Sequence, residues 1–157
     1  MTSGRLVVAQ VCRTFEPTIG GLERSVGGLC RALRDRGHTV RVVTLHQGDA
    51  GVSVPGVEVV RLPRVGPRRW ALGAGLGRAL RGVDLVHVHG IDGLLDQALW
   101  AAAVPVGVST HGGYLHTARH RRLKALWLRS GTRWSFGRAA RVWFTSEADR
   151  EALGPAR

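Results

Sequence analysis

The sequence predicts an α/β fold built on a Rossmann-like, doubly wound and mainly parallel sheet. Short apolar runs recur along the chain, and segments with helical spacing or turn residues separate them. Strands that alternate with helices in this way are typical of parallel sheets with right-handed crossovers. The 157 residues, 44% of them apolar, are enough for one domain with a substantial core.

The first strand and helix carry the clearest pattern. Residues 6–12 form an apolar run, apolar residues recur at helical spacing over residues 22–33, and Gly37 then ends the helix. Gly20 and Gly21 lie just before the helix. Glycines let the backbone approach a ligand, and the free N–H groups of a helix start favour an anion such as a phosphate. The alternative is that both glycines only shape a turn and cap.

The remaining elements follow in chain order. We expect strands at residues 39–45, 57–62, 83–89, 104–110 and 141–145. We expect helices at residues 70–81, 91–102 and 147–153, the first of them weakened by three glycines. A sheet of this kind binds ligands outside the carboxyl ends of its strands. The loops that begin at Arg13, His46, His89 and His111 are therefore the predicted functional edge.

The charge of the chain points to an anionic partner. The net charge is +12, from 23 Lys and Arg against 11 Asp and Glu, and Lys124 is the only lysine. Nucleic acid, a phosphorylated ligand and an acidic membrane surface all fit this balance. Cys12 and Cys30 fall in the first strand and helix, without zinc or redox spacing, so we expect buried apolar side chains in a reduced, cytoplasmic protein.

The basic residues concentrate in one segment. Residues 116–146 hold eight Lys and Arg and no acidic residue. On a helix the arginines would gather on one side and the apolar residues on the other, an arrangement typical of an anchor on anionic lipid. The alternative is an apolar side packed in the core and a solvated basic face. The predicted membrane-facing residues are Arg119, Arg122, Trp127, Arg129 and Arg133.

Two histidines lie at the end of the fourth predicted strand. His87 and His89 are two residues apart, so their side chains point to the same face, a spacing that metal ligands also use. No cysteine or carboxylate cluster accompanies them. We therefore expect hydrogen-bonded histidines and no metal.

Four motifs in order resemble the N-terminal domain of family 4 glycosyltransferases. They are Pro-Thr-Ile-Gly-Gly-Leu-Glu at 17–23, Arg-Asp-Arg-Gly-His-Thr-Val-Arg-Val at 34–42, Asp-Leu-Val-His-Val-His-Gly at 84–90 and Ser-Thr-His-Gly at 109–112. The resemblance extends from residue 6 to about residue 153. It implies the acceptor-binding half of a two-domain GT-B architecture, whose other half binds a nucleotide-sugar. It also implies transfer with retention at the anomeric carbon, and neither a metal nor another cofactor.

The resemblance also implies roles for individual residues. Gly20 and Gly21 would bring backbone N–H groups to the donor diphosphate. His111 would face the transferred sugar as the catalytic residue. The implied acceptor contacts are His89, Asp92, Thr110 and Gly112. Glu23 has a structural interpretation instead, because an acid in the first helical turn suits the helix dipole.

The expected organisation is a single domain over residues 1–157, truncated before its last strand and before a C-terminal donor-binding domain. No two glutamates have the spacing of that domain's donor motif, so we expect the chain to be inactive alone. The expected partners are a nucleotide-sugar, a sugar or lipid-linked acceptor, a donor-binding domain or subunit, and an anionic membrane surface. The location expected is cytoplasmic, and peripheral at the inner face of the membrane.

The sequence leaves two other classes of protein as alternatives. A non-catalytic basic α/β domain that binds nucleic acid or membrane is the main alternative, but zinc spacing and RNP-like stretches are missing, so nucleic acid is not expected as a partner. A dinucleotide-dependent oxidoreductase needs a GxGxxG fingerprint after the first strand. The long loop over residues 13–19 takes its place.

Overall fold

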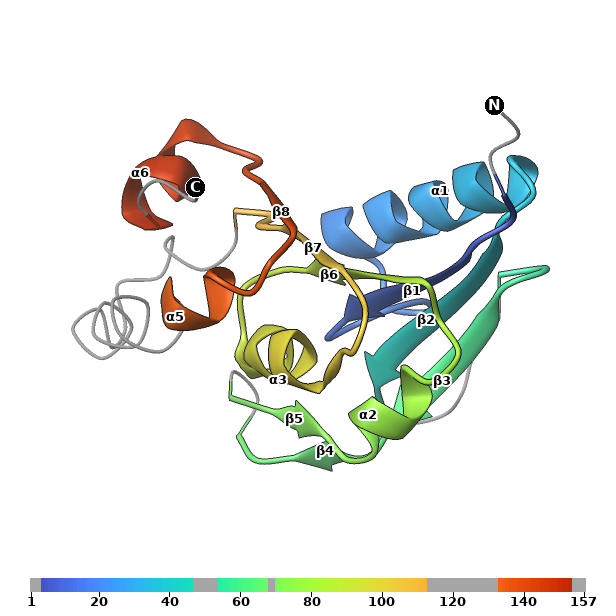
Figure 1. The fold of residues 1–157 in the computed structure, drawn as a ribbon, viewed down its shortest axis with the longest axis horizontal. Coiled ribbons are helices and arrows are strands. Elements are labelled where there is room, and N and C mark those ends of the chain that lie inside the picture. The colour runs from blue at the N-terminus through green and yellow to red at the C-terminus, as the bar shows by residue number, and fades with distance from the viewer. Residues whose placement is uncertain (1–3, 47–53, 68–69, 113–132, 154–157) are drawn as a thin grey trace.

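Six parallel strands form the centre of the computed structural model, which describes residues 4–46, 54–67, 70–112 and 133–153 (Figure 1). The strands are β1 (Val7–Cys12), β2 (Thr39–Leu45), β3 (Glu58–Leu62), β6 (Leu85–His89), β7 (Val106–Ser109) and β8 (Arg141–Trp143). Their order across the sheet is β3-β2-β1-β6-β7-β8, and every neighbouring pair is parallel. The predicted Rossmann-like sheet is confirmed.

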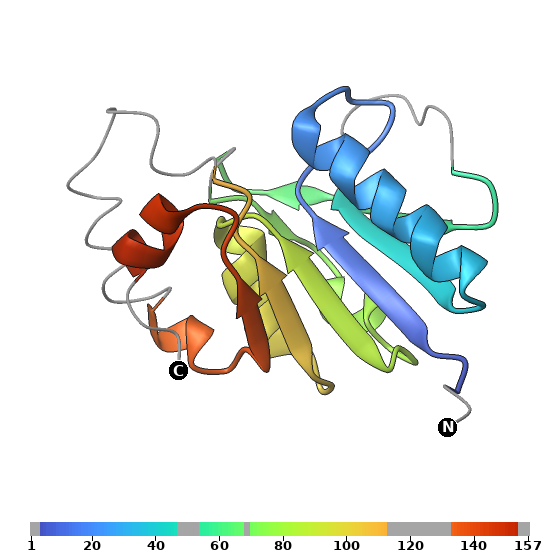
Figure 2. The ribbon, with the colours of Figure 1, turned by 90° about the horizontal axis from the view of Figure 1, so that it is seen from above.

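Helices cover both faces of this sheet (Figure 2). Helix α1 (Gly21–Asp35) lies across one face, and α2 (Leu76–Ala79) and α3 (Gly93–Ala101) lie against the other. The short α5 (Arg133–Phe136) and α6 (Glu147–Leu153) flank the β8 end. The strand order reverses between β1 and β6, and this switch point is where doubly wound sheets bind their ligands.

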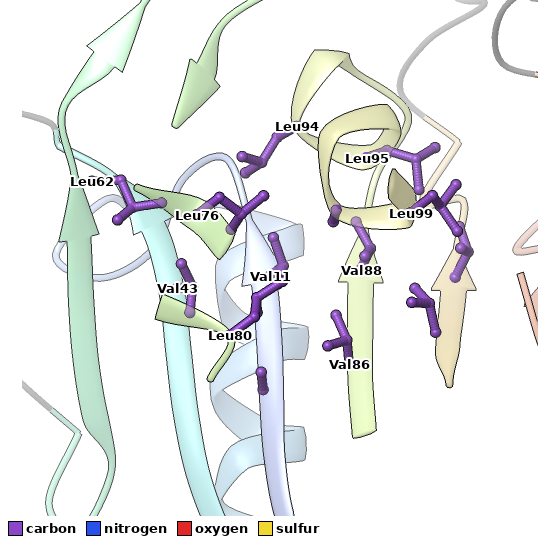
Figure 3. Close-up of a cluster of buried hydrophobic side chains, with 14 of the residues drawn as sticks. Val11, Val43, Leu62, Leu76, Leu80, Val86, Val88, Leu94, Leu95 and Leu99 are labelled. Atoms are coloured by element: carbon purple, nitrogen blue, oxygen red, sulfur yellow. The ribbon is translucent and has the colours of Figure 1, made fainter. Parts of the chain in front are cut away.

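Alternation along the strands divides the core into two clusters. Ala9, Val11, Val86 and Val88 pack with the leucines of α2 and α3 (Figure 3). Cys12 and its neighbours on β2 pack instead against α1. Because successive side chains in a strand point to opposite faces, the polar residues that alternate with the first set lie on the α1 face. Those residues include the side chains of the candidate site.

The strand and helix predictions agree with the structure to within about two residues at most boundaries, with one exception. Residues 70–81 do not form a helix: β4 (Arg64–Val65) pairs antiparallel with β5 (Leu72–Gly73), and only the single turn of α2 follows. Gly75 adopts a left-handed φ of 85°, and a Cβ on Gly73 would lie 2.6 Å from a methyl of Leu62. These glycines serve a close approach and a turn, which a continuous helix would not permit.

The basic segment is described only at its end. Arg119, Arg122, Trp127 and Arg129 lie outside the described residues, and Arg133 begins α5. Within the described ranges, no helix is long and apolar enough to span a membrane.

Both cysteines are buried and free, as predicted. Burial raises the pKa of Cys12 above its usual range and raises the pKa of Cys30 to about 11. The two thiols are therefore protonated at neutral pH, and they pack as small apolar side chains.

Candidate functional site

A chain of three hydrogen-bonded side chains spans the switch point of the sheet. His89, the last residue of β6, has its Nε2 2.6 Å from Oε1 of Gln10 on β1. Its Nδ1 lies 3.0 Å from Nε2 of His111, in the loop after β7. These three hydrogen-bonded side chains therefore extend from the buried centre of the sheet to its carboxyl edge.

Strand register produces this arrangement. His89 is paired with Cys12 on one side and with Ser109 on the other, so the ends of β1, β6 and β7 are level. His111 follows two residues later with a left-handed φ of 53°. Such a conformation costs a non-glycine residue about 1 kcal/mol or more, and the contact with His89 contributes to holding the ring there.

His87 belongs to the same cluster. Its Nε2 lies 2.9 Å from Oγ of Ser109, and its ring centroid is 4.1 Å from that of His89 and 5.2 Å from that of Trp143. The prediction that His87 and His89 share a face and are hydrogen-bonded is confirmed. Among residues 4–46, 54–67, 70–112 and 133–153, no group of three or more His, Cys, Asp or Glu could hold a metal ion.

All three imidazoles are neutral at physiological pH. Burial, reinforced by the neighbouring histidines, lowers the pKa of His87 from 6.5 to about 4 and that of His89 to about 2. Burial also lowers the pKa of His111, against the opposing field of the Asp149 carboxylate. Neutral imidazoles each carry one N–H donor and one bare nitrogen, so the cluster can both donate and accept hydrogen bonds.

Thr110 is directed away from the histidines. Its hydroxyl donates to Oδ2 of Asp149 at 2.7 Å, and that carboxylate, only 3% exposed, also accepts from Thr145 at 3.1 Å. The Thr145 backbone N–H in turn donates to the Thr110 hydroxyl. This network joins the end of β7 to α6, so the Thr110 side chain has a structural role, and its acceptor contact stays a prediction. Gly112 turns the chain here with a φ of 65°.

Asp92 caps helix α3. Its Oδ1 accepts from the N–H groups of Leu94 at 3.0 Å and Leu95 at 3.2 Å. Burial raises the pKa of this carboxyl, and the nearby Arg13 and the two N–H groups partly offset the increase. A cap was not foreseen; acceptor binding by Asp92 stays a prediction.

The cap makes a test possible. Asp92→Ala is expected to lower the free energy of unfolding by about 1 kcal/mol, since two helix N–H groups lose their acceptor. Asp92→Asn is the matched control. The amide oxygen of asparagine can accept the same two hydrogen bonds, so the free energy of unfolding should fall markedly less in this variant than in Asp92→Ala. Urea denaturation of both variants measures the difference, and equal losses would contradict a capping role.

The Gly-Gly start of α1 borders the same edge. Gly20 is the N-cap in an extended conformation, and Glu23 lies in the first turn as predicted, accepting a hydrogen bond from Thr14. A Cβ on Gly20 would collide with the Glu23 carboxylate, whereas a Cβ on Gly21 would meet nothing within 4 Å. The helix start also approaches the His89 loop, because a methyl of Leu22 lies 3.8 Å from where a Cβ of Gly90 would be. Gly21 thus has open space at its Cα, at the same edge of the sheet as the His89 loop.

Two polar residues of the site were not predicted from the sequence. Gln10 is fully buried within an apolar strand, and Asp149 is buried in α6. A lone glutamine among apolar residues was a signal that could have been read, because a buried amide needs hydrogen-bond partners. Asp149 sits in an ordinary charged helix pattern, so nothing local marks it.

Comparison with known proteins identifies one family and three similar enzymes. The chain matches the sequence model of Glycosyltransferase Family 4 over residues 19–155. It is similar to three enzymes named GDP-mannose:cellobiosyl-diphosphopolyprenol alpha-mannosyltransferase. The one from Komagataeibacter xylinus is 38% identical over 138 residues, which cover 81% of this chain and 35% of the relative. The one from Xanthomonas campestris is 35% identical over 154 residues, covering 90% and 40%.

The third relative, from Xanthomonas oryzae pv. oryzae, is 36% identical, covering 96% of this chain and 44% of its own length. The chain therefore spans about two fifths of the length of the curated relatives it matches.

Proposed function

The chain belongs to glycosyltransferase family 4, and from this premise we propose that it is the acceptor-binding half of a retaining glycosyltransferase. In this proposal the chain works with a second, donor-binding domain or subunit. A sugar moves from a nucleotide-sugar to an acceptor hydroxyl in the cleft between the two. The carboxyl edge formed by β1, β6 and β7 is the acceptor side of that cleft.

We further propose the substrates by chemical class. The relatives are named for GDP-mannose as donor and for a disaccharide on diphosphopolyprenol as acceptor. The donor proposed here is GDP-mannose, and the acceptor is a sugar linked to a polyprenyl diphosphate. The arginine-rich composition, with a net charge of +12, suits partners that both carry diphosphate groups.

The observation that carries the proposal is the histidine cluster beside an open helix start. His111 lies at the carboxyl edge of the sheet and is hydrogen-bonded to His89, and Gly21 borders the same edge. Neutral imidazoles suit hydrogen bonding to sugar hydroxyls, and free backbone N–H groups at a helix start suit a diphosphate. In the proposed cleft, these groups would face the sugar and the diphosphate of the donor held by the other domain, at the edge where the acceptor binds.

The chemistry assigned to these residues is positioning and charge stabilisation. The acceptor hydroxyl oxygen forms a bond to the anomeric carbon as the bond from that carbon to the donor phosphate oxygen breaks. The leaving diphosphate takes the hydroxyl proton, so no protein base is required. The N–H groups of Gly20 and Gly21 stabilise the charge that develops on the diphosphate, and His111 orients the transferred sugar.

Transfer by the full-length protein tests this proposal. We expect labelled mannose to pass from GDP-mannose to a polyprenyl-diphosphate disaccharide, and the one-bond C1–H1 coupling of the product to report an α-linkage. A β-linked product would contradict retention, and transfer to water alone would contradict the acceptor class.

A surface patch supports an anionic membrane as a further partner. Trp100 at the end of α3 and Trp134 on α5 are 44% and 69% exposed, with ring centroids 4.4 Å apart. The Arg138 guanidinium lies 4.2 Å from the Trp100 ring centroid. Exposed tryptophans next to arginine fit the headgroup region of anionic lipid, where a polyprenyl-linked acceptor would also reside.

Vesicle binding tests the patch. Trp134→Ser in the full-length protein is expected to weaken binding to anionic vesicles about tenfold, since one large side chain no longer inserts. Val65→Ser is the matched control, because Val65 is also exposed, at 55%, but lies on the β4–β5 hairpin. Equal binding of the wild type to anionic and neutral vesicles would rule out the proposed surface.

A further inference from the structure

Gln10 is the least expected residue near the site. It is fully buried within β1, and its Oε1 lies 2.6 Å from Nε2 of His89. Its other polar atom, Nε2, is buried with no hydrogen-bond partner among the described residues. A buried amide N–H without a partner costs about 1–3 kcal/mol, so an apolar residue of similar size would suit the core better. The contact with His89 is what the amide provides here.

That contact fixes which atom donates and which accepts in each hydrogen bond of the Gln10–His89–His111 series. An amide oxygen only accepts hydrogen bonds, so the hydrogen of His89 is on Nε2 and its Nδ1 is bare. The bare Nδ1 lies 3.0 Å from Nε2 of His111, so His111 carries its hydrogen on Nε2. Its remaining nitrogen, Nδ1, is then bare. Burial keeps the three histidines of the cluster neutral, which preserves this single-proton pattern.

We propose that Gln10 and His89 are positioning residues that fix the tautomer of His111, so that its bare Nδ1 accepts a hydrogen bond from a sugar hydroxyl. The inference rests on the proposed function, since it assigns the partner of His111 within the glycosyl-transfer site. It adds a specificity element: a hydroxyl can satisfy Nδ1, whereas a ligand with only acceptor atoms at that point cannot. The left-handed backbone of His111 fixes where the ring is held, and Gln10 fixes which nitrogen can accept.

The Gln10→Met variant removes the acceptor while keeping the side-chain length. His89 Nε2–H then has no partner in an apolar site, so His89 is expected to move its hydrogen to Nδ1 and donate to His111. His111 is thereby forced to carry its hydrogen on Nδ1. Thr44→Val is the matched control, because Thr44 is equally buried on the neighbouring strand β2 and its hydroxyl makes no hydrogen bond to Gln10, His89 or His111.

Two measurements on the full-length enzyme test whether Gln10 and His89 fix the tautomer of His111. Long-range ¹H–¹⁵N spectra of the imidazoles should show a bare Nδ1 on His111 in the wild type and in Thr44→Val, and a protonated Nδ1 in Gln10→Met. Turnover with GDP-mannose should fall about tenfold in Gln10→Met, the size expected when a group that orients a functional side chain is lost. It should not change in Thr44→Val.

Three results would overturn the proposal: a protonated Nδ1 on His111 in the wild type, an unchanged tautomer in Gln10→Met, or a reversed tautomer with unchanged turnover. The wild-type spectrum decides even if Gln10→Met does not fold. Failure of the proposed function is distinguishable, because an enzyme that transfers no mannose would still give the expected wild-type spectrum.

Discussion

Replacing His111 by Ala in the full-length enzyme is expected to lower kcat by about 10²-fold, the usual cost of removing one preorganised hydrogen bond at a reacting centre. His111 is held at the carboxyl edge of the sheet by its contact with His89 and by its own left-handed backbone. Its ring is therefore ordered before substrate arrives, and alanine cannot replace the hydrogen bond to the sugar that we propose for it. The measurement is initial-rate kinetics with saturating concentrations of the proposed substrates, GDP-mannose and the lipid-linked acceptor.

The matched control is His38→Ala. His38 lies just before β2, at the opposite edge of the sheet, where its Nδ1 accepts from the backbone N–H of Leu6 at 3.3 Å. This variant should keep wild-type turnover. Equal kcat values for the wild type and His111→Ala, with both proteins folded by circular dichroism, would remove His111 from the site and with it the proposed role of this edge.

The free energy of unfolding is expected to fall as the pH is lowered from 6.5 to 4. Burial lowers the pKa of His87 to about 4 and that of His89 to about 2, whereas both titrate near 6.5 in the unfolded chain. Between these values the two histidines bind more protons in the unfolded state than in the folded state, so their contribution to stability rises with pH across this window. The raised pKa of the buried Asp92 carboxyl acts in the opposite sense. Each histidine contributes a slope of up to about 1.4 kcal/mol per pH unit.

Urea denaturation at pH 7.0, 6.0 and 5.0 measures this slope. His87→Gln keeps a side chain able to bond to Ser109 but removes one of the three rings whose pKa burial lowers. The free energy of unfolding of this variant should therefore fall less steeply with decreasing pH than that of the wild type. A His87→Gln variant with the slope of the wild type would show that the buried cluster is not the source of the acid sensitivity.

Much of the architecture follows from local patterns. Apolar runs bounded by turn residues predicted all six strands of the main sheet, and Thr39–Leu45 and Glu147–Leu153 were predicted to the residue. The Gly-Gly helix start was also predicted, since spacing and capping preferences act within a few residues. The error at residues 70–81 has a tertiary cause: Gly73 packs against Leu62 of β3, and helical periodicity alone does not reveal that contact.

By itself, then, the sequence determined the parallel sheet, most of the alternation of strands and helices along the chain, and the edge at which His89 and His111 lie. Only the tertiary structure decided what those residues contact. The Gln10–His89, Thr110–Asp149 and His89–His111 bonds join residues 79, 39 and 22 positions apart. Strand register and burial set such pairs, because a parallel sheet brings distant strand ends level and leaves a buried polar group only the partners that the fold supplies.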